Sequence, residues 1–362
     1  MKSAPAIPAF LAVLAAAFCV HAQDAPASSE KSVETRYSVA VIDDATFYSN
    51  LSAPIPTTLN QVLVEPTFSL HYDNRWSFST SLISDTTTYS DTATQLHVRE
   101  TYAGLSAGDF DFTAGRKLVR WGTGYAFTAA GVLDPPRAPT NPTDRLNLNE
   151  GRDMIKADWV HGPHALTLAW STAALAPAAS NLHDTTAFRY NVLVHGFDTS
   201  LIAGNDRGGD SFGALTFTRV LGQAWEVHGE AAWREHEAIL LGAKYTMANG
   251  IRFIGEFFTP PNIPYYRDAG VSPTAGRQHY AFLYAGKSRL RERPGWKEWD
   301  VSGSIVYNLN DHSYTGVFDV NRWFGKHVSS YVHAEIPVGS KTSEYGSAPY
   351  STATSIGMRF QL

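Results

Sequence analysis

The chain has 362 residues, and its 29 Lys and Arg against 34 Asp and Glu give a formal net charge of −5 at pH 7. This acidic balance argues against a nucleic-acid partner, because such partners are bound by an excess of basic side chains. The one cysteine, Cys19, lies in an N-terminal segment that we expect to be cleaved. Neither disulfides nor thiolate metal ligands are therefore expected in the mature chain.

The N-terminal segment is typical of a secretory signal peptide. Lys2 precedes an apolar run over residues 10–20, and the segment ends at Ala22. The run is too short for a transmembrane helix, which needs about 20 apolar residues. The residues that follow are rich in Ala, Ser, Pro and charged side chains and are expected to form a periplasmic tail. The predicted domains are a signal peptide (1–22), this tail (23–33) and one folded domain (34–362).

From residue 34 onward, apolar and polar residues alternate in short segments, and this period of two is that of a β-strand. In residues 225–236, for example, Glu226, His228 and Glu230 alternate with mostly apolar residues. The 9 Trp, 17 Tyr and 19 Phe residues suit the aromatic girdles of a membrane barrel. The pattern favours an all-β fold, a transmembrane antiparallel β-barrel, over a soluble β-sandwich with the same alternation.

About 18 strands are expected, because short turns alternate with longer connections along the chain, as periplasmic turns and extracellular loops do. Short turns with Gly or Asn include 107–109 and 249–250, and long connections include 122–150 and 339–350. Barrels of 14 or 16 strands stay open as alternatives. The predicted strands begin near residues 34, 60, 76, 95, 110, 151, 164, 185, 197, 211, 224, 238, 251, 276, 299, 313, 327 and 351.

The segment 122–150, between a predicted strand over 110–121 and another over 151–161, is predicted to be the functional loop. It contains four prolines, which fix φ and remove hydrogen-bond donors, and a loop of this length is usually functional. We expect it to fold into the lumen as a constriction or lid, so that deleting 131–145 raises the conductance. The loop residues expected nearest the solute are Asp134, Arg137, Asp144 and Arg145.

Charged residues predicted to face the lumen are unevenly distributed. Such walls of opposite charge would set a transverse field, and lining charges together with pore diameter decide selectivity. The alternative is a narrow barrel in which these charges neutralise one another as a polar plug. The predicted pore-lining residues are basic in the first half of the barrel (Arg99, Arg116, Arg120, Arg152, Lys156, Arg189) and acidic in the second (Glu226, Glu230, Glu256, Asp319, Glu335).

Two segments resemble known outer-membrane proteins. The C-terminal residues 357–362 resemble the last strand that such proteins present to the barrel assembly machinery, with Leu362 at the end and Phe360 two residues before it. The motifs at 115–116, 121–122 and 141–144 resemble the strand and loop of several porin-like outer-membrane families. The resemblance implies a passive pore whose loop folds toward the lumen. The alternative is that Trp121 is a girdle residue at the start of a surface loop.

The sequence therefore predicts a porin or channel of the Gram-negative outer membrane, through which small hydrophilic solutes diffuse passively. No cofactor is expected, and a homotrimer is a candidate assembly. The expected partners are outer-membrane lipid and lipopolysaccharide, the barrel assembly machinery and small solutes. The second hypothesis is a structural, export or surface-polysaccharide assembly protein with a closed lumen.

An enzyme is not expected. His327 and Ser329 share a face with Glu335, as a hydrolase would require, but His327 falls in a predicted periplasmic turn. A metal site is not expected either. His228 and His236 share a face of one strand, yet eight residues separate them, which corresponds to about 27 Å.

Overall fold

The computed structural model describes residues 32–362 except 53–54, 74, 90, 136, 142–144, 174–183, 207–209, 235–236, 260–277 and 289–297. The predicted signal peptide and nearly all of the predicted tail lie outside these residues, as does Asp144 of the predicted loop. Within the described part, no helix is long and apolar enough to cross a membrane.

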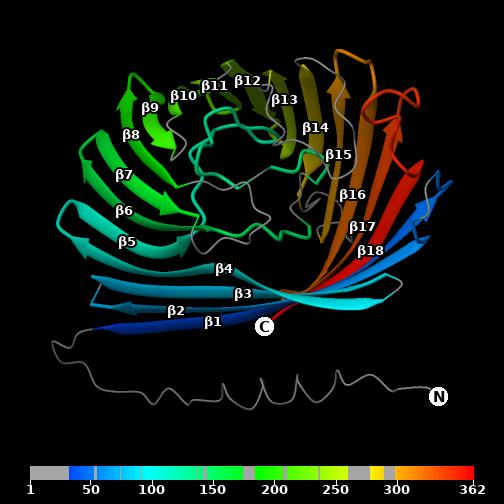
Figure 1. Ribbon diagram of the computed structural model, residues 1–362, viewed down its shortest axis with the longest axis horizontal. Coiled ribbons are helices and arrows are strands. Elements are labelled where there is room, and N and C mark those ends of the chain that lie inside the picture. The colour runs from blue at the N-terminus through cyan, green and yellow to red at the C-terminus, as the bar shows by residue number, and fades with distance from the viewer. Residues whose placement is uncertain are drawn as a thin grey trace. The chain divides into compact units, whose positions relative to one another are not determined.

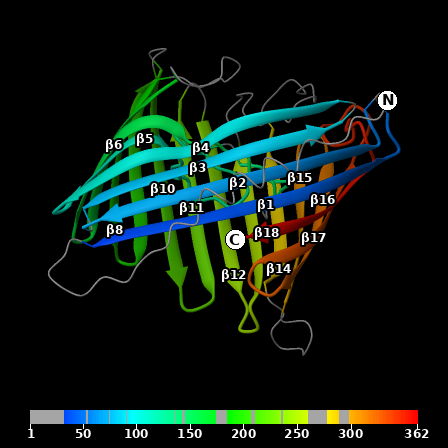
Figure 2. The same ribbon diagram turned by 90° about the horizontal axis from the view of Figure 1, so that it is seen from below.

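Eighteen antiparallel strands form one sheet that closes on itself (Figures 1 and 2). The strands are β1 (Val33–Ser49), β2 (Thr58–Tyr72), β3 (Trp76–Thr88), β4 (Thr92–Ala107), β5 (Phe110–Lys117), β6 (Arg152–His161), β7 (His164–Thr172), β8 (Thr185–Val194), β9 (Phe197–Asp206), β10 (Ser211–Leu221), β11 (Trp225–Trp233), β12 (Glu237–Thr246), β13 (Ile251–Thr259), β14 (Tyr280–Lys287), β15 (Trp299–Asn308), β16 (Tyr314–Phe324), β17 (Val328–Val338) and β18 (Thr352–Gln361).

Each strand pairs with the next one in the chain, and the barrel closes where β1 pairs with β18, from Ala40 opposite Gln361 to Ser49 opposite Thr352. Closure satisfies the backbone groups that an open sheet would leave at its edges. The predicted all-β antiparallel barrel is confirmed, and so is the count of 18 strands.

Tight turns join several of the strand pairs at one end of the barrel. Gly108 between β4 and β5 has a φ of 62°, and Gly325 between β16 and β17 has a φ of 75°. Glycine adopts these positive φ angles without the steric cost that a Cβ brings. The longest connection, residues 118–151 between β5 and β6, lies at the opposite end, as the alternation of short and long links predicts.

The two faces of the wall differ in exposure. Trp225 and Trp233 of β11 are 50% and 51% exposed, whereas His228 and Glu230 between them are 1% and 3% exposed. Outward leucines on other strands, such as Leu283 of β14 at 62%, are also exposed. On β11 ionisable side chains therefore point into the barrel, and large apolar side chains cover the outside of the wall.

β5 ends earlier than predicted, at Lys117 instead of Trp121. Gly115 has a φ of 126°, a conformation that interrupts a regular strand, and the backbone N–H of Leu118 donates to the Glu100 carboxylate at 2.9 Å instead of to a neighbouring strand. Arg120, predicted as a strand residue, therefore belongs to the connection 118–151, which we call the inner loop.

Candidate functional site

The inner loop folds into the barrel, where Figure 1 shows it inside the ring of strands. Trp121, Ala130 and Leu133 are at most 4% exposed. They pack against inward side chains of β7 to β10, namely Ala169, Ala187, Ile202, Phe212 and Ala214. Trp121 is thus an interior residue, and its alternative role in an outer aromatic girdle is excluded.

A second apolar contact follows a few residues later. The ring of Phe127 stacks on Phe258 of β13, with ring centroids 4.8 Å apart and an angle of 14° between the planes. It also meets Phe282 of β14 edge-on at 6.5 Å. Burying such rings gives the first part of the loop a fixed position on this wall.

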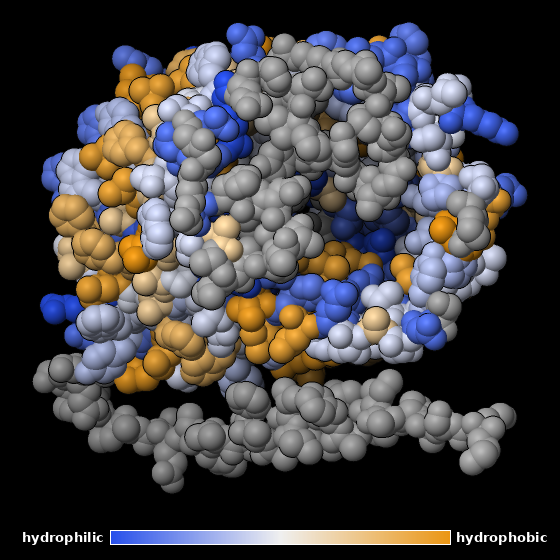
Figure 3. All heavy atoms as spheres, in the orientation of Figure 1, coloured by the Kyte–Doolittle hydropathy of each residue, from blue (hydrophilic) through white to orange (hydrophobic). Residues whose placement is uncertain are grey.

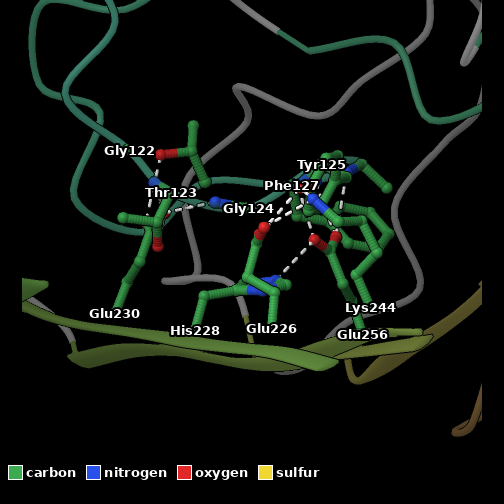
Figure 4. A network of polar contacts seen from close by, with 12 residues as sticks. Gly122, Thr123, Gly124, Tyr125, Phe127, Glu226, His228, Glu230, Lys244 and Glu256 are labelled. Atoms are coloured by element: carbon green, nitrogen blue, oxygen red, sulfur yellow. Dashed lines mark hydrogen bonds and ion pairs between the residues drawn. The ribbon is translucent and has the colours of Figure 1, made fainter. Parts of the chain in front are cut away.

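The carboxylate of Glu230 on β11 binds the backbone of the inner loop (Figure 4). One carboxylate oxygen accepts hydrogen bonds from the N–H groups of Thr123 and Gly124, the latter at 2.9 Å. The other oxygen accepts from the N–H groups of Ala129 and Ala130 at 2.6 and 2.7 Å. Hydroxyl groups of the loop add further bonds to the same carboxylate, from Thr123 and Thr128.

The carboxylate of Glu256 on β13 binds the backbone of residues 125–127, which lie between the residues held by Glu230 (Figure 4). Its carboxylate accepts from the backbone N–H groups of Tyr125, Ala126 and Phe127, the second of these at 2.9 Å. His228 Nε2 lies 3.0 Å from the same carboxylate. Gly242 makes room for that ring, because a Cβ at this position would lie 2.2 Å from His228 Nε2.

The hydrogen bonds of Glu230 and Glu256 to the inner loop satisfy the polar groups of both partners. A loop inside a protein needs partners for its backbone N–H groups, and a buried carboxylate needs donors. Hydrogen bonds to an ionised acceptor are stronger than neutral ones. Glu230 and Glu256 are 3% and 4% exposed, so both carboxylates are held almost entirely by the loop and by neighbouring side chains.

Asp134 and Arg137 stabilise the inner loop by hydrogen bonds to its own backbone. Asp134 accepts from the backbone N–H groups of Trp121 and Gly122 at 2.6 and 3.1 Å. Burial raises the pKa of the Asp134 carboxyl, and these two bonds oppose the rise. Arg137 donates to the Gly122 carbonyl at 3.1 Å. Both residues were predicted to lie nearest the solute, and this stays a prediction beside their contacts within the loop.

The second part of the loop is attached to a different region of the wall. Arg145 forms an ion pair with Asp44 of β1, and the Tyr331 hydroxyl of β17 donates to the same carboxylate at 2.7 Å. Near this contact, Leu146 and Leu148 pack against a small apolar cluster of Ile42, Leu63 and Ile83 on β1 to β3.

The loop returns to the wall through ion pairs on β4, β5 and β6. Arg99 binds Glu65 at 3.1 Å and the Asn147 carbonyl at 3.4 Å. Arg116 binds Asp153 at 2.7 Å and Glu150 at 2.9 Å.

Arg116 is held by two acidic partners, Asp153 and Glu150. In the register of β5 with β6, Thr113 lies opposite Lys156 and Arg116 lies opposite Asp153. The place of Arg116 in the pore lining stays a prediction. The ion pair with Asp153 neutralises the Arg116 charge within the wall.

The other predicted basic residues of the strands lie on inward positions with neighbours of their own. Arg152 contacts the Thr185 hydroxyl at 3.4 Å, Lys156 pairs with Asp158, and Arg189 donates to the Ser200 hydroxyl at 2.9 Å. Arg120 is exposed in the inner loop.

The predicted acidic residues divide into two groups. Glu230 and Glu256 hold the loop, as described above. The remaining three contact side chains on the inside of the wall: Glu226 binds Lys244 at 2.5 Å and the Tyr125 hydroxyl at 2.7 Å, Asp319 binds His333 at 2.8 Å, and Glu335 accepts from Thr315 at 3.4 Å.

A cavity of about 430 Å³ lies between the loop and part of the wall. Tyr125 and Arg145 form its loop side, and burial raises the pKa of the Tyr125 hydroxyl. Sequence reasoning did not single out Tyr125, because an aromatic residue in a loop carries no signal of its direction. The charged residues from the strands that line the cavity are Lys244, Arg252, Lys287, Asp300, Asp319 and Arg359.

Within the described residues, no group of three or more His, Cys, Asp or Glu side chains is arranged to hold a metal ion.

Two solved structures from Pseudomonas aeruginosa have a similar fold. OccK5 (OpdH) aligns with a TM-score of 0.62 and 7% identity over 91% of this chain and 98% of its own. OccK11 (OpdR) aligns with a TM-score of 0.61 and 10% identity over 91% of this chain and 96% of its own. No family model and no curated protein sequence matches the chain. At these identities the similarity concerns the fold.

Proposed function

We propose that the chain is an outer-membrane porin through which small hydrophilic solutes diffuse passively, without a cofactor and without enzymatic activity. The observation that carries this proposal is the inner loop, which is bound to the wall at Glu230 and Glu256 on one side and at Asp44 on another. A loop held in this way narrows a barrel without filling it, and a polar cavity of about 430 Å³ lies beside it. The fold shared with OccK5 and OccK11 supports the same function.

The outside of the barrel supports an outer-membrane location. Leu168, Leu201 and Leu283 point outward with 56%, 55% and 62% of their surfaces exposed. Each such side chain gains about 1.5 to 3 kcal/mol when apolar surroundings replace water. We propose membrane lipid, including lipopolysaccharide, as the main contact of this face, with a homotrimer as the candidate assembly. The C-terminal strand β18 is the proposed contact for the barrel assembly machinery.

Single-channel conductance in planar bilayers tests the proposal. The full barrel should give a stable open current. In the deletion variant, an Asn-Gly turn replaces residues 118–151, which is feasible because Lys117 and Arg152 are direct partners in the register of β5 with β6. This variant should conduct more than the native chain, because the constriction is gone.

Protein-free bilayers and the heat-denatured chain are the controls. No current from either folded form would contradict the porin proposal, and it would favour the hypothesis of an export or assembly protein with a closed lumen. An unchanged current after deletion would show that the inner loop does not limit conduction.

A further inference from the structure

The cavity lies on one side of the inner loop. On the side of β7 to β10 and of β13 and β14, apolar side chains fill the contact between loop and wall, including Trp121 and Phe127. The wall from β12 to β18 contributes polar and charged residues to the cavity, and most of its lining comes from β15 to β18 and β14. Figure 3 shows a recess with hydrophilic residues on the side where Figure 1 places β15 to β18.

Most charged groups around the cavity already have a protein partner. Arg145 is paired with Asp44, Lys244 with Glu226 and Asp319 with His333. Two others have polar neighbours: the Trp323 indole N–H donates to Asp300 at 2.7 Å, and Arg252 donates to the Ser288 hydroxyl at 3.0 Å.

Arg359 of β18 differs from these groups. It lies between Met358 and Phe360, which point outward with 42% and 39% exposure, so its own side chain points inward. It lies opposite Ser329 of β17, which also lines the cavity. In the part of the chain that the structure describes, its guanidinium group takes part in no hydrogen bond or ion pair, although it is only partly exposed.

We propose that solutes pass between the inner loop and the wall of β12 to β18, through this cavity, and that Arg359 binds their anionic groups and so determines specificity. This inference rests on the proposed porin function. A guanidinium group presents donors in a planar fork that matches a carboxylate or a similar anion, and the confined site strengthens the attraction. A cation that is already neutralised by a protein carboxylate, as Arg145 and Lys244 are, attracts a passing anion less.

The experiment compares reversal potentials in a potassium chloride gradient for the native barrel and three variants. Arg359→Gln removes the charge and should shift the reversal potential toward that of a cation-selective pore. Arg359→Lys keeps the charge and should stay near the native value. Arg322→Gln is the matched control on the outer face of β16, where Arg322 lies 5.2 Å from the Trp299 ring, and it should leave the potential unchanged.

A second arm tests the route. Arg189→Gln removes an inward cation of β8, on another part of the wall, and should shift the potential less than Arg359→Gln does. Liposome swelling then compares potassium acetate with arabinose as probes, and Arg359→Gln should slow acetate entry relative to arabinose. Gel mobility before and after heating verifies that each variant is folded.

The outcomes separate the two proposals. A native barrel that conducts, with Arg359→Gln unchanged or shifted no more than Arg189→Gln, would overturn the route and the role of Arg359 while leaving the porin function intact. A native barrel that gives no current would overturn the porin function itself.

Discussion

The two parts of the inner loop are held on the wall by different chemistry. Residues 121–134 bind Glu230 and Glu256 mainly through backbone N–H groups, with Trp121 and Phe127 buried alongside. Residues 145–150 bind through side chains, with Arg145 on Asp44 and Glu150 on Arg116. The first attachment depends on the wall residues and on the path of the backbone. The second depends on the identity of the loop's own side chains.

This difference predicts which substitutions release each part. Substitutions within the loop cannot remove its backbone hydrogen bonds to a wall carboxylate, because every residue except proline has the same N–H group. An ion pair between two side chains is broken from either end. Changes at β11 and β13 should therefore have larger effects than changes within residues 145–150.

The largest effect is expected for Glu230→Gln. The amide keeps one acceptor oxygen but turns an NH₂ group toward backbone N–H groups of the loop, at a site that is 3% exposed. Each buried N–H group left without an acceptor costs about 1 to 3 kcal/mol, and several N–H groups share this carboxylate. We expect residues 121–134 to leave the wall. In an Ala129→Cys background, which keeps the backbone bond of this residue to Glu230, the introduced thiol should then react with a maleimide at least about a hundredfold faster, since 1.4 kcal/mol corresponds to a factor of ten.

Glu226→Gln is the matched control for this measurement. Glu226 is an inward glutamate on the same strand, but it binds the loop only through the Tyr125 hydroxyl and also binds Lys244. Its replacement should leave the labelling of the introduced thiol close to the parent rate. Equal labelling in the two variants would contradict the assignment of Glu230 as the main attachment of this part.

The strand pattern could be predicted from the sequence because alternation is local: each outward Leu or Trp is followed by an inward residue, and this indicated all 18 strands. The inward direction of Glu230 and Glu256 was also predictable. Their role in holding the inner loop was not predictable. Their partners are backbone N–H groups about a hundred residues away, and such groups are the same at every position. The ion pair of Arg116 with Asp153 was not predictable for a related reason, since it depends on the register of β5 with β6.

A smaller effect is expected for Arg145→Met. The substitution keeps much of the apolar volume but leaves Asp44, which is 1% exposed, with the Tyr331 and Thr46 hydroxyls as its remaining donors. Losing one hydrogen bond to a charged group costs about 1.5 to 3 kcal/mol. The urea midpoint of the folded barrel in lipid vesicles should fall, and the labelling of a thiol at position 129 should not change.

The double variant Arg145→Met, Asp44→Asn sharpens this test. It removes the buried charge together with its partner, so part of the lost stability should return. A double variant that is as unstable as the sum of the two single variants would show that the two residues do not interact energetically.

The smallest expected effect is the change of stability with pH that the loop carboxyl groups of Asp134 and Asp311 cause. Because burial raises the pKa of Asp134, its contribution to stability is present below the ordinary pKa of a carboxyl group and is lost as the pH rises through the raised value. Asp311, between β15 and β16, has the opposite sign. Burial would raise the pKa of Asp311, but hydrogen bonds from the Glu344 N–H and from Ser313 outweigh it and lower the pKa. Its contribution is present above the ordinary value and is lost as the pH falls through the lowered one.

Urea midpoints measured between about pH 3 and pH 7 distinguish the two carboxyls, because Asp groups titrate in this window. Relative to the native barrel, Asp134→Asn should become more stable as the pH rises, since the amide lacks the cost of ionising a buried carboxyl. Asp311→Asn should become less stable over the same range. Parallel pH profiles for both variants and the native chain would mean that neither carboxyl is coupled to folding, and that the first part of the loop is held by Glu230 and Glu256 independently of Asp134.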